Sequence, residues 1–263
     1  MFYTRYALLS KNSNDKNIDT IACFNDANTL DSIPKLYFEV NVKINIDKNQ
    51  DEFDKALTIA KYLRSEIKGG GGLGLSSAKT LEMMLAGKGG VCSDFAQIFS
   101  IFCFINDIRV REWGCVDRFY KTQFGHSFNE IYATQQQKWI AIDMHKAIIF
   151  EDVAHNNYFA AIDLFEDLRN GNPLHYKHYS DFRTGEHDRI ETIYSKGAIP
   201  FLIENKNTAT VDHYYNKYQE SMPIIMINIM LLLAGKSQHF IFVLDNYKEK
   251  LLPEYFQNLK SKS

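Results

Sequence analysis

Apolar residues along the first ninety positions repeat with two different periods. Residues 36–46 (LYFEVNVKINI) alternate apolar and polar side chains, which predicts a β-strand. Residues 51–68 instead repeat apolar side chains every three or four positions, which predicts an amphipathic helix. The glycines of residues 69–74 end this helix in a loop, and Ser76 or Ser77 caps a short helix that follows.

A second glycine stretch, at residues 87–90, precedes a longer helix and then a run of strands. The helix is predicted over about residues 92–106, where phenylalanines recur on one stripe. The strands are predicted over residues 108–116, 124–132 and 138–144. A further helix is expected over about residues 154–169, before a glycine and a proline end it.

The last third of the chain has a weaker pattern. Residues 174–200 are polar and rich in tyrosine, and we expect them to be mostly loop. Beyond Pro200 we expect an α+β tail. Its apolar run at residues 224–233 fits two structures: a strand that forms a hairpin with residues 240–244, or an apolar helix.

Composition narrows the class of protein. The 263 residues are 45% hydrophobic and 24% charged, which is typical of a globular chain. Thirty Lys and Arg against 32 Asp and Glu give a net charge of −2, which argues against a nucleic-acid partner. No signal peptide is evident at the N-terminus, and the longest apolar run, 224–234, is well short of a membrane span. We therefore expect a cytoplasmic protein.

Several motif-like stretches lack the context that their function requires. Residues 69–74 (GGGGLG) satisfy a dinucleotide-binding pattern but follow a helix rather than a strand. Residues 235–237 (GKS) would need a glycine where Met230 stands to form a phosphate loop. His175 and His178 have no carboxylate or thiol at ligand spacing, and the cysteines show no zinc-site spacing. We expect neither a metal nor a cofactor.

One arrangement does point to chemistry, and it begins at Cys92. This residue lies where a glycine-rich turn meets the start of a predicted helix. The dipole and free N–H groups of a helix N-terminus favour negative charge, so a thiol there has a lowered pKa and is a better nucleophile. Cys103 and Cys115 are interpreted as core residues, because they lie within apolar sequence.

The predicted hairpin of residues 124–132 and 138–144 supplies two partners for this thiol. A loop near residues 133–136 would place His126 directly opposite Asp143. Directly opposed residues point to the same face, with Cβ atoms about 5 Å apart. The carboxylate can then hold one imidazole nitrogen and leave the other for Cys92, which is the logic of a catalytic triad.

Three sequence blocks carry a family resemblance: residues 90–96 (GVCSDFA), 126–132 (HSFNEIY) and 139–143 (WIAID). In order and spacing they resemble the transglutaminase-like superfamily, a branch of the papain-like cysteine enzymes, over roughly residues 50–150. The chain departs from the family in having Phe128 rather than Trp after the histidine, and Met144 and His145 where proline often follows the aspartate.

The resemblance implies a fold class and a division of the chain. The fold would be α+β, with the helix that carries the cysteine packed on an antiparallel sheet that carries the histidine and aspartate. Residues 1–50 would form an N-terminal extension with a strand. Residues 51–170 would form the transglutaminase-like catalytic core, and residues 171–263 a C-terminal α+β extension.

The resemblance also implies roles for residues. Cys92, His126 and Asp143 would be the nucleophile, the base and the residue that orients the base. Trp139 is expected to pack over the histidine–aspartate pair, and the residues expected to contact substrate are Trp139, Gly90 and Phe128. The oxyanion would be held by the Cys92 backbone N–H and a second donor. The activity would be hydrolysis or acyl transfer at a peptide or protein amide, with a peptidase or amidase favoured over a cross-linking enzyme.

Two other functions stay open. Residues 88–92 (KGGVC) are similar to the Arg-Gly-Gly-x-Cys motif of arylamine N-acetyltransferases, although the sequence after Asp143 departs from that family. Alternatively, the chain is a non-catalytic binding module that keeps the fold. Rapid labelling of a single thiol below pH 7 would favour an enzyme.

Overall fold

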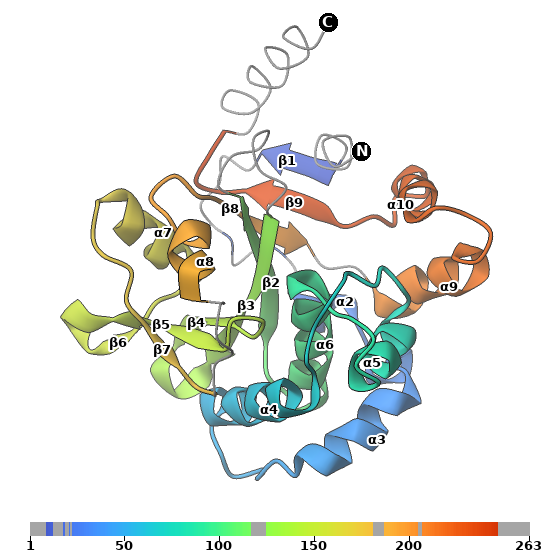
Figure 1. The fold of residues 1–263 in the computed structure, drawn as a ribbon, viewed down its shortest axis with the longest axis horizontal. Helices are drawn as coiled ribbons and strands as arrows, with labels where there is room; N and C mark the ends of the chain where they lie inside the picture. Colours follow the sequence, from blue (N-terminus) through green and yellow to red (C-terminus); the bar gives the residue numbers. More distant parts are fainter. Residues whose placement is uncertain are drawn as a thin grey trace, which may run out of the picture.

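The computed structural model describes residues 9–12, 18, 21, 23–116, 125–180, 187–204 and 207–246, and Figure 1 shows its elements. The described helices are α2 (Phe24–Ala27), α3 (Lys35–Ile44), α4 (Glu52–Glu66), α5 (Ser77–Leu85), α6 (Cys92–Ile105), α7 (Ala161–Arg169), α8 (His187–Ile193), α9 (Thr208–Tyr218) and α10 (Ile224–Leu233). The described strands are β1 (Ser10–Asn12), β2 (Val110–Val116), β3 (Gly125–Ala133), β4 (Lys138–Asp143), β5 (Ile148–Asp152), β6 (Asn157–Tyr158), β7 (Tyr176–His178), β8 (Ile199–Glu204) and β9 (His239–Phe242).

The strands form one sheet in the order β1-β9-β8-β2-β3-β4-β5-β6, with β7 also paired to β5. Neighbouring strands run antiparallel except for β1 and β9, which pair in parallel. The fold is therefore α+β with a mostly antiparallel sheet, which confirms the expected class. The β2-β3-β4 meander lies inside the sheet, with β8, β9 and β1 on one side of it and β5, β6 and β7 on the other.

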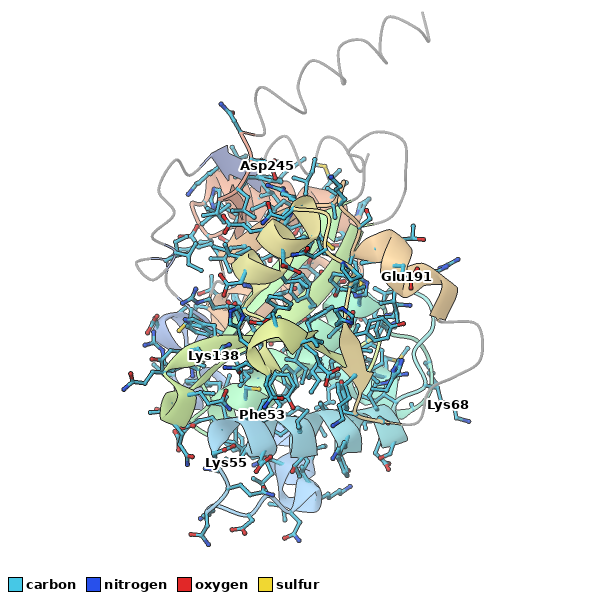
Figure 2. The ribbon with its side chains drawn as sticks, turned by 90° about the vertical axis from the view of Figure 1, so that its left-hand side faces the viewer. Phe53, Lys55, Lys68, Lys138, Glu191 and Asp245 are labelled. Atoms are coloured by element: carbon cyan, nitrogen blue, oxygen red, sulfur yellow. The ribbon has the colours of Figure 1, made fainter. Side chains whose placement is uncertain are left out.

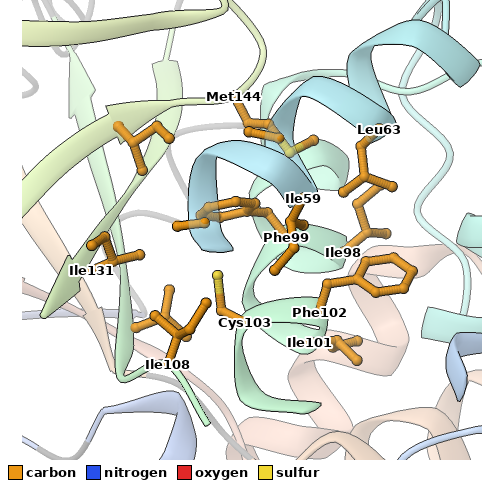
Figure 3. Packing of buried hydrophobic residues seen from close by; sticks show 14 of the residues in the cluster. Ile59, Leu63, Ile98, Phe99, Ile101, Phe102, Cys103, Ile108, Ile131 and Met144 are labelled. Carbon is orange, nitrogen blue, oxygen red and sulfur yellow. The ribbon is translucent and has the colours of Figure 1, made fainter. Parts of the chain in front are cut away.

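Helices α3 to α6 cover one face of the sheet, and α6 lies beside β2 and β3 (Figure 1). Figure 3 shows the packing under α6, where side chains from the helix meet those of α4 and of the sheet. Ile131 of β3 and Phe99 of α6 belong to this cluster, and both are fully buried. Cys103 lies among these residues (Figure 3), and burial raises its pKa well above the ordinary value, so it is a core thiol as expected.

The opposite face of the sheet is covered by α7 and α8. Phe128 of β3, Ala141 of β4 and Phe165 of α7 belong to one cluster there, separate from the cluster under α6. Successive side chains of β3 point to opposite faces of the sheet, which separates the two clusters. Ile131 thus faces α6, while Phe128 faces α7. Helix α4, from the first face, also reaches the edge of the sheet. Its Phe53 ring stacks on the ring of Tyr158 in β6, with the centroids 4.9 Å apart, and Phe53 is labelled below Lys138 in Figure 2.

The predicted strand at residues 36–46 is wrong, because these residues form α3. Pro34 stands at its N-cap with an extended backbone, and Asn45 ends it in the left-handed conformation (φ 54°). Tyr37, Val40 and Ile44 supply a buried stripe at helical spacing. The alternation was misleading because Val42 is also apolar although it is 80% exposed. In residues 1–50 the described strand is instead β1.

Later segments also differ from expectation. The helix predicted over 154–169 begins only at Ala161, because residues 153–158 form a 3-10 turn and β6. The segment predicted as mostly loop, 174–200, contains β7, α8 and the start of β8. The apolar run 224–233 is a helix, with Pro223 at its N-cap, so the hairpin alternative is wrong. The α+β character expected beyond Pro200 is confirmed.

Candidate active site

Cys92 is the first residue of α6. Val91, in extended conformation, is its N-cap, and the Asp94 carboxylate in the first turn accepts a hydrogen bond from the Val91 N–H at 2.9 Å. The same carboxylate oxygen accepts one from the Leu73 N–H at 3.3 Å, which ties the first glycine loop to the helix start. The thiol therefore lies at the positive end of a 14-residue helix, as the sequence predicts.

The two glycine stretches pack against each other and fix the approach to Cys92. The Gly70 N–H donates to the Gly90 carbonyl and the Gly90 N–H donates to the Gly71 carbonyl, both at 2.8 Å. Gly90 has φ +120°, and a Cβ there would lie 2.7 Å from the Met84 Cε. A side chain at this position would therefore strain the backbone and displace Met84. Gly90 thus shapes the turn before the thiol.

His126 and Asp143 share a face of the β3–β4 hairpin and are in direct contact. The His126 Nε2–H donates to the Asp143 Oδ2 at 2.6 Å. The predicted pairing of His126 with Asp143 is off by two residues, because Glu130 lies opposite Ala141 rather than opposite Trp139. Residues 134–137 form the turn, which closes with Gln137 in the left-handed conformation. A two-residue shift keeps every side chain on its predicted face, so the contact survives.

Asp143 is fully buried and accepts hydrogen bonds from three groups. Besides His126, the Tyr194 hydroxyl donates to its Oδ2 at 2.8 Å and the Lys146 backbone N–H donates to its Oδ1 at 2.9 Å. Sequence reasoning missed Tyr194 because it follows α8, in a segment predicted to be loop. No motif marks it, so pattern alone offered no signal.

The pKa values of Asp143 and His126 are shifted in opposite directions. Burial raises the pKa of Asp143, but the charge of His126 and its hydrogen bond outweigh burial and lower that pKa to about 2. Burial likewise lowers the pKa of His126, yet Asp143 and Cys92 together raise it to about 10. An ionised carboxylate beside an imidazolium is therefore the stable state around neutral pH.

The Cys92 thiol interacts with this imidazole at the start of β3. Its Sγ lies 3.9 Å from the Gly125 carbonyl oxygen. Burial raises the pKa of Cys92, but the charge of His126 and a hydrogen bond with it outweigh burial, so the pKa is lowered. Since His126 Nε2 is occupied by Asp143, Nδ1 remains for the thiol. The arrangement can hold a thiolate next to an imidazolium that is able to return a proton.

Trp139 lies elsewhere than predicted. Its ring faces the Arg111 guanidinium at 3.5 Å and the Tyr132 ring at 5.3 Å. The rings that contact His126 are those of Tyr194 and His145, so these two side chains, rather than Trp139, flank the pair. The expectation that Trp139 covers the histidine–aspartate pair is therefore wrong.

Phe128 is completely buried below the pair. Its ring contacts those of Phe150, Phe165 and Tyr194 at centroid distances of 6.3, 6.2 and 5.6 Å. A side chain without exposed surface supports its neighbours, and it would have to move to touch a substrate. The expected contact between Phe128 and substrate does not fit this position.

His145 is a second imidazole near the site that sequence reasoning noted only as a departure from the family pattern. Its ring lies 5.7 Å from His126 and 5.3 Å from Phe95. Its buried Nδ1 has no hydrogen-bond partner among the described residues. Burial and the charge of His126 lower its pKa to about 3, so His145 stays neutral beside the imidazolium.

The neighbours of His126 along its strand have structural partners. The Glu130 carboxylate accepts hydrogen bonds from Trp113 Nε1 at 2.9 Å and from the Ala161 N–H at 2.8 Å, which anchors the start of α7. The Asn129 side chain donates to the Ala96 carbonyl at 3.2 Å and to Ser100 Oγ at 3.0 Å, which fastens α6 to β3. Both residues hold the strand and helix that position the site.

A helix with an N-terminal cysteine packs on an antiparallel sheet that carries a histidine–aspartate pair. Residues 41–144 match the family model of the transglutaminase-like superfamily, which confirms the resemblance drawn from the three sequence blocks. No curated protein and no solved structure matches the chain.

None of the described helices is both long and apolar enough to cross a bilayer. Within the same ranges, no three His, Cys, Asp or Glu side chains gather as a metal site.

Proposed function

We propose that the protein is a cysteine-dependent enzyme that cleaves or transfers the acyl group of amide bonds, with Cys92, His126 and Asp143 as its catalytic triad. The observation that carries this proposal is the buried His126–Asp143 hydrogen bond of 2.6 Å beside a thiol at a helix N-terminus. A structural histidine has no need of a buried carboxylate on one side and a thiol on the other.

The mechanism follows from the charges of these groups. The Cys92 thiolate attacks the amide carbonyl, and the oxyanion that forms lies near the free N–H groups of the first turn of α6. The His126 imidazolium then protonates the leaving amine, which releases it and leaves a thioester on Cys92. His126, now neutral, takes a proton from the incoming water or amine as it attacks the thioester. Collapse of the second intermediate releases the acid or the new amide and restores the Cys92 thiolate beside the imidazolium.

The proposal also covers the acyl acceptor and the substrate. The resemblance to peptidase-like members of the superfamily favours water over an amine, and thus a peptidase or amidase over a cross-linking enzyme. The substrate would be a peptide or protein amide.

Thiol labelling of the intact protein tests the proposal. We expect one thiol to react with iodoacetamide much faster than the others below pH 7, and expect Cys92→Ser to abolish that fast phase. Cys23→Ser is the matched control, because the Cys23 thiol donates to Asp26 at 3.1 Å and a hydroxyl can replace it. Equal rates for all thiols would favour a non-catalytic module.

Trapping of the intermediate extends this test to the reaction itself. An activated ester should acylate Cys92, as seen by mass spectrometry, and the adduct should decay in water. An adduct that persists until an arylamine is added would instead favour the acetyltransferase alternative.

A further inference from the structure

Tyr194 meets the candidate triad from outside the segment that matches the family. Its hydroxyl donates to Asp143 Oδ2 at 2.8 Å, and the same oxygen accepts the His126 Nε2–H at 2.6 Å. The family match ends at residue 144, and Tyr194 follows α8, whose exposed residue Glu191 is labelled in Figure 2. One oxygen atom of the carboxylate is thus shared between the imidazole and a distant phenol.

The position of this hydroxyl is fixed by the packing of its ring. Tyr194 is 1% exposed, and its ring meets Phe150 at 4.6 Å and Phe128 at 5.6 Å, both edge-on. It also meets the imidazole of His126 at 5.9 Å, again edge-on. Because a buried phenol without a partner is costly, the ring cage and the carboxylate together select this single arrangement.

We propose that Tyr194 is a positioning residue of the active site, whose hydroxyl orients Asp143 and limits the pull of its carboxylate on the His126 proton. This inference rests on the proposed function, because it assigns Tyr194 a part in the same triad. It also implies that the site is completed by the C-terminal part of the chain.

The chemical reason is that Asp143 Oδ2 accepts hydrogen bonds from two donors, His126 and Tyr194. A second donor stabilises the carboxylate and makes it a weaker acceptor toward His126. Without that donor the imidazolium would be held more strongly, and it would release its proton to the leaving amine less readily. Burial and the nearby charge of Asp143 raise the pKa of Tyr194 well above its usual value, so the hydroxyl stays protonated as a donor.

Tyr194→Phe tests the proposal, because it removes the hydroxyl and keeps the ring. Tyr179→Phe is the matched control. Its hydroxyl donates to the backbone carbonyls of Asp143 and Met144 at 3.3 and 3.5 Å and leaves the carboxylate untouched. The measurements are the NMR titration of the His126 ring and the rate of turnover, or of ester acylation of Cys92, with folding checked by circular dichroism.

We expect Tyr194→Phe to raise the titration midpoint of His126 by roughly 0.5–1 pH unit and to slow acylation about tenfold. Tyr179→Phe should leave the midpoint in place. An unchanged midpoint in a folded Tyr194→Phe protein would overturn the proposal. The titration needs no turnover, so failure of the proposed function would show separately, as a Cys92 that reacts no faster than the other thiols.

A second variant covers the case in which Tyr194→Phe does not fold. Replacing Tyr194 with 3-fluorotyrosine keeps the shape of the ring and makes the hydroxyl a stronger donor. The midpoint of His126 should then move downward. No movement, or a movement upward, would contradict the proposed role.

Discussion

The two faces of the sheet bury different kinds of side chain. The face under α3 to α6 is filled mostly by hydrocarbon, where Ile131 and Ile140 meet the helices. The opposite face buries two carboxylates, Asp143 and Glu130, each held by hydrogen bonds from other segments. Hydrocarbon packing stabilises the fold and holds α6 against the sheet, whereas buried carboxylates are stable only when every hydrogen-bond partner is in place. Variants on the two faces should therefore fail in different ways.

The largest expected effect belongs to the proposed triad. Cys92→Ala should remove all covalent chemistry, and the double change with His126→Ala should be no worse, because residues that act as a unit lose activity together. Asp143→Asn should lower turnover by roughly 10²- to 10⁴-fold, since the amide can stabilise the wrong imidazole tautomer. Turnover of an amide or thioester substrate measures both. Wild-type turnover in Cys92→Ala would show that the nucleophile is assigned wrongly.

A matched pair of phenylalanines separates the faces by stability and reactivity. Phe99→Ala, under α6, and Phe128→Ala, on the opposite face, should each lower the free energy of unfolding by roughly 3–5 kcal/mol. Only Phe128→Ala should also slow the alkylation of Cys92, because Phe128 supports Tyr194 next to His126. Urea unfolding and iodoacetamide kinetics measure the two quantities. Equal alkylation rates in the two variants would remove the distinction between the faces.

Substitutions in the glycine turn before Cys92 should have a smaller effect on stability, and a second glycine, Gly71, serves as the control. Gly90→Ala should cost roughly 1–3 kcal/mol of unfolding free energy, because the residue has φ +120° and a Cβ would meet Met84. Gly71→Ala should be close to neutral, since a Cβ there meets no atom within 4 Å. Thermal unfolding distinguishes them, and equal losses would mean that the turn tolerates a side chain at Gly90.

The stability of the fold should also depend on pH. The pKa of His126 is about 10, above its ordinary 6.5, so its contribution is complete below pH 6.5 and is lost as pH rises toward 10. The pKa of Asp143 is about 2, below its ordinary 3.8, so its contribution is lost as pH falls toward 2. Urea unfolding between pH 6 and 10 should show a decline that His126→Gln flattens. A decline of the same slope in that variant would assign it to other groups.

Local patterns in the sequence predicted the part of the site that lies close together in the chain. The start of α6 at Cys92 and the shared face of His126 and Asp143 follow from a glycine turn and a strand alternation, each within a few residues. The exact hairpin register could not be predicted from these patterns. It depends on Gln137 adopting a left-handed backbone conformation, which glutamine does not favour.

The contributions from distant segments could not be predicted. Tyr194 reaches Asp143 across 51 positions, and nothing in residues 174–200 distinguishes it from the neighbouring tyrosines. The error at residues 36–46 had a different cause, since α3 leaves apolar Val42 in solvent and so imitates the alternation of a strand. The sequence pattern of one segment shows which of its side chains are apolar. Tertiary contacts determine which of these are buried and which residues they contact.

The order of the strands also constrains how the chain is assembled during its synthesis. Strand β1 pairs with β9 through Ser10 and Phe240, and the edge of β2 opposite β3 is covered by β8, which begins at Ile199. While a ribosome is still adding residues before Ile199, β2 exposes a row of unpaired backbone groups that can pair with other nascent chains. The layer formed by α3 to α6 is complete by Ile105, long before that edge closes. Newly made chains thus pass through a period in which α3 to α6 are formed and the β2 edge is open, and the synthesis of β8 ends it.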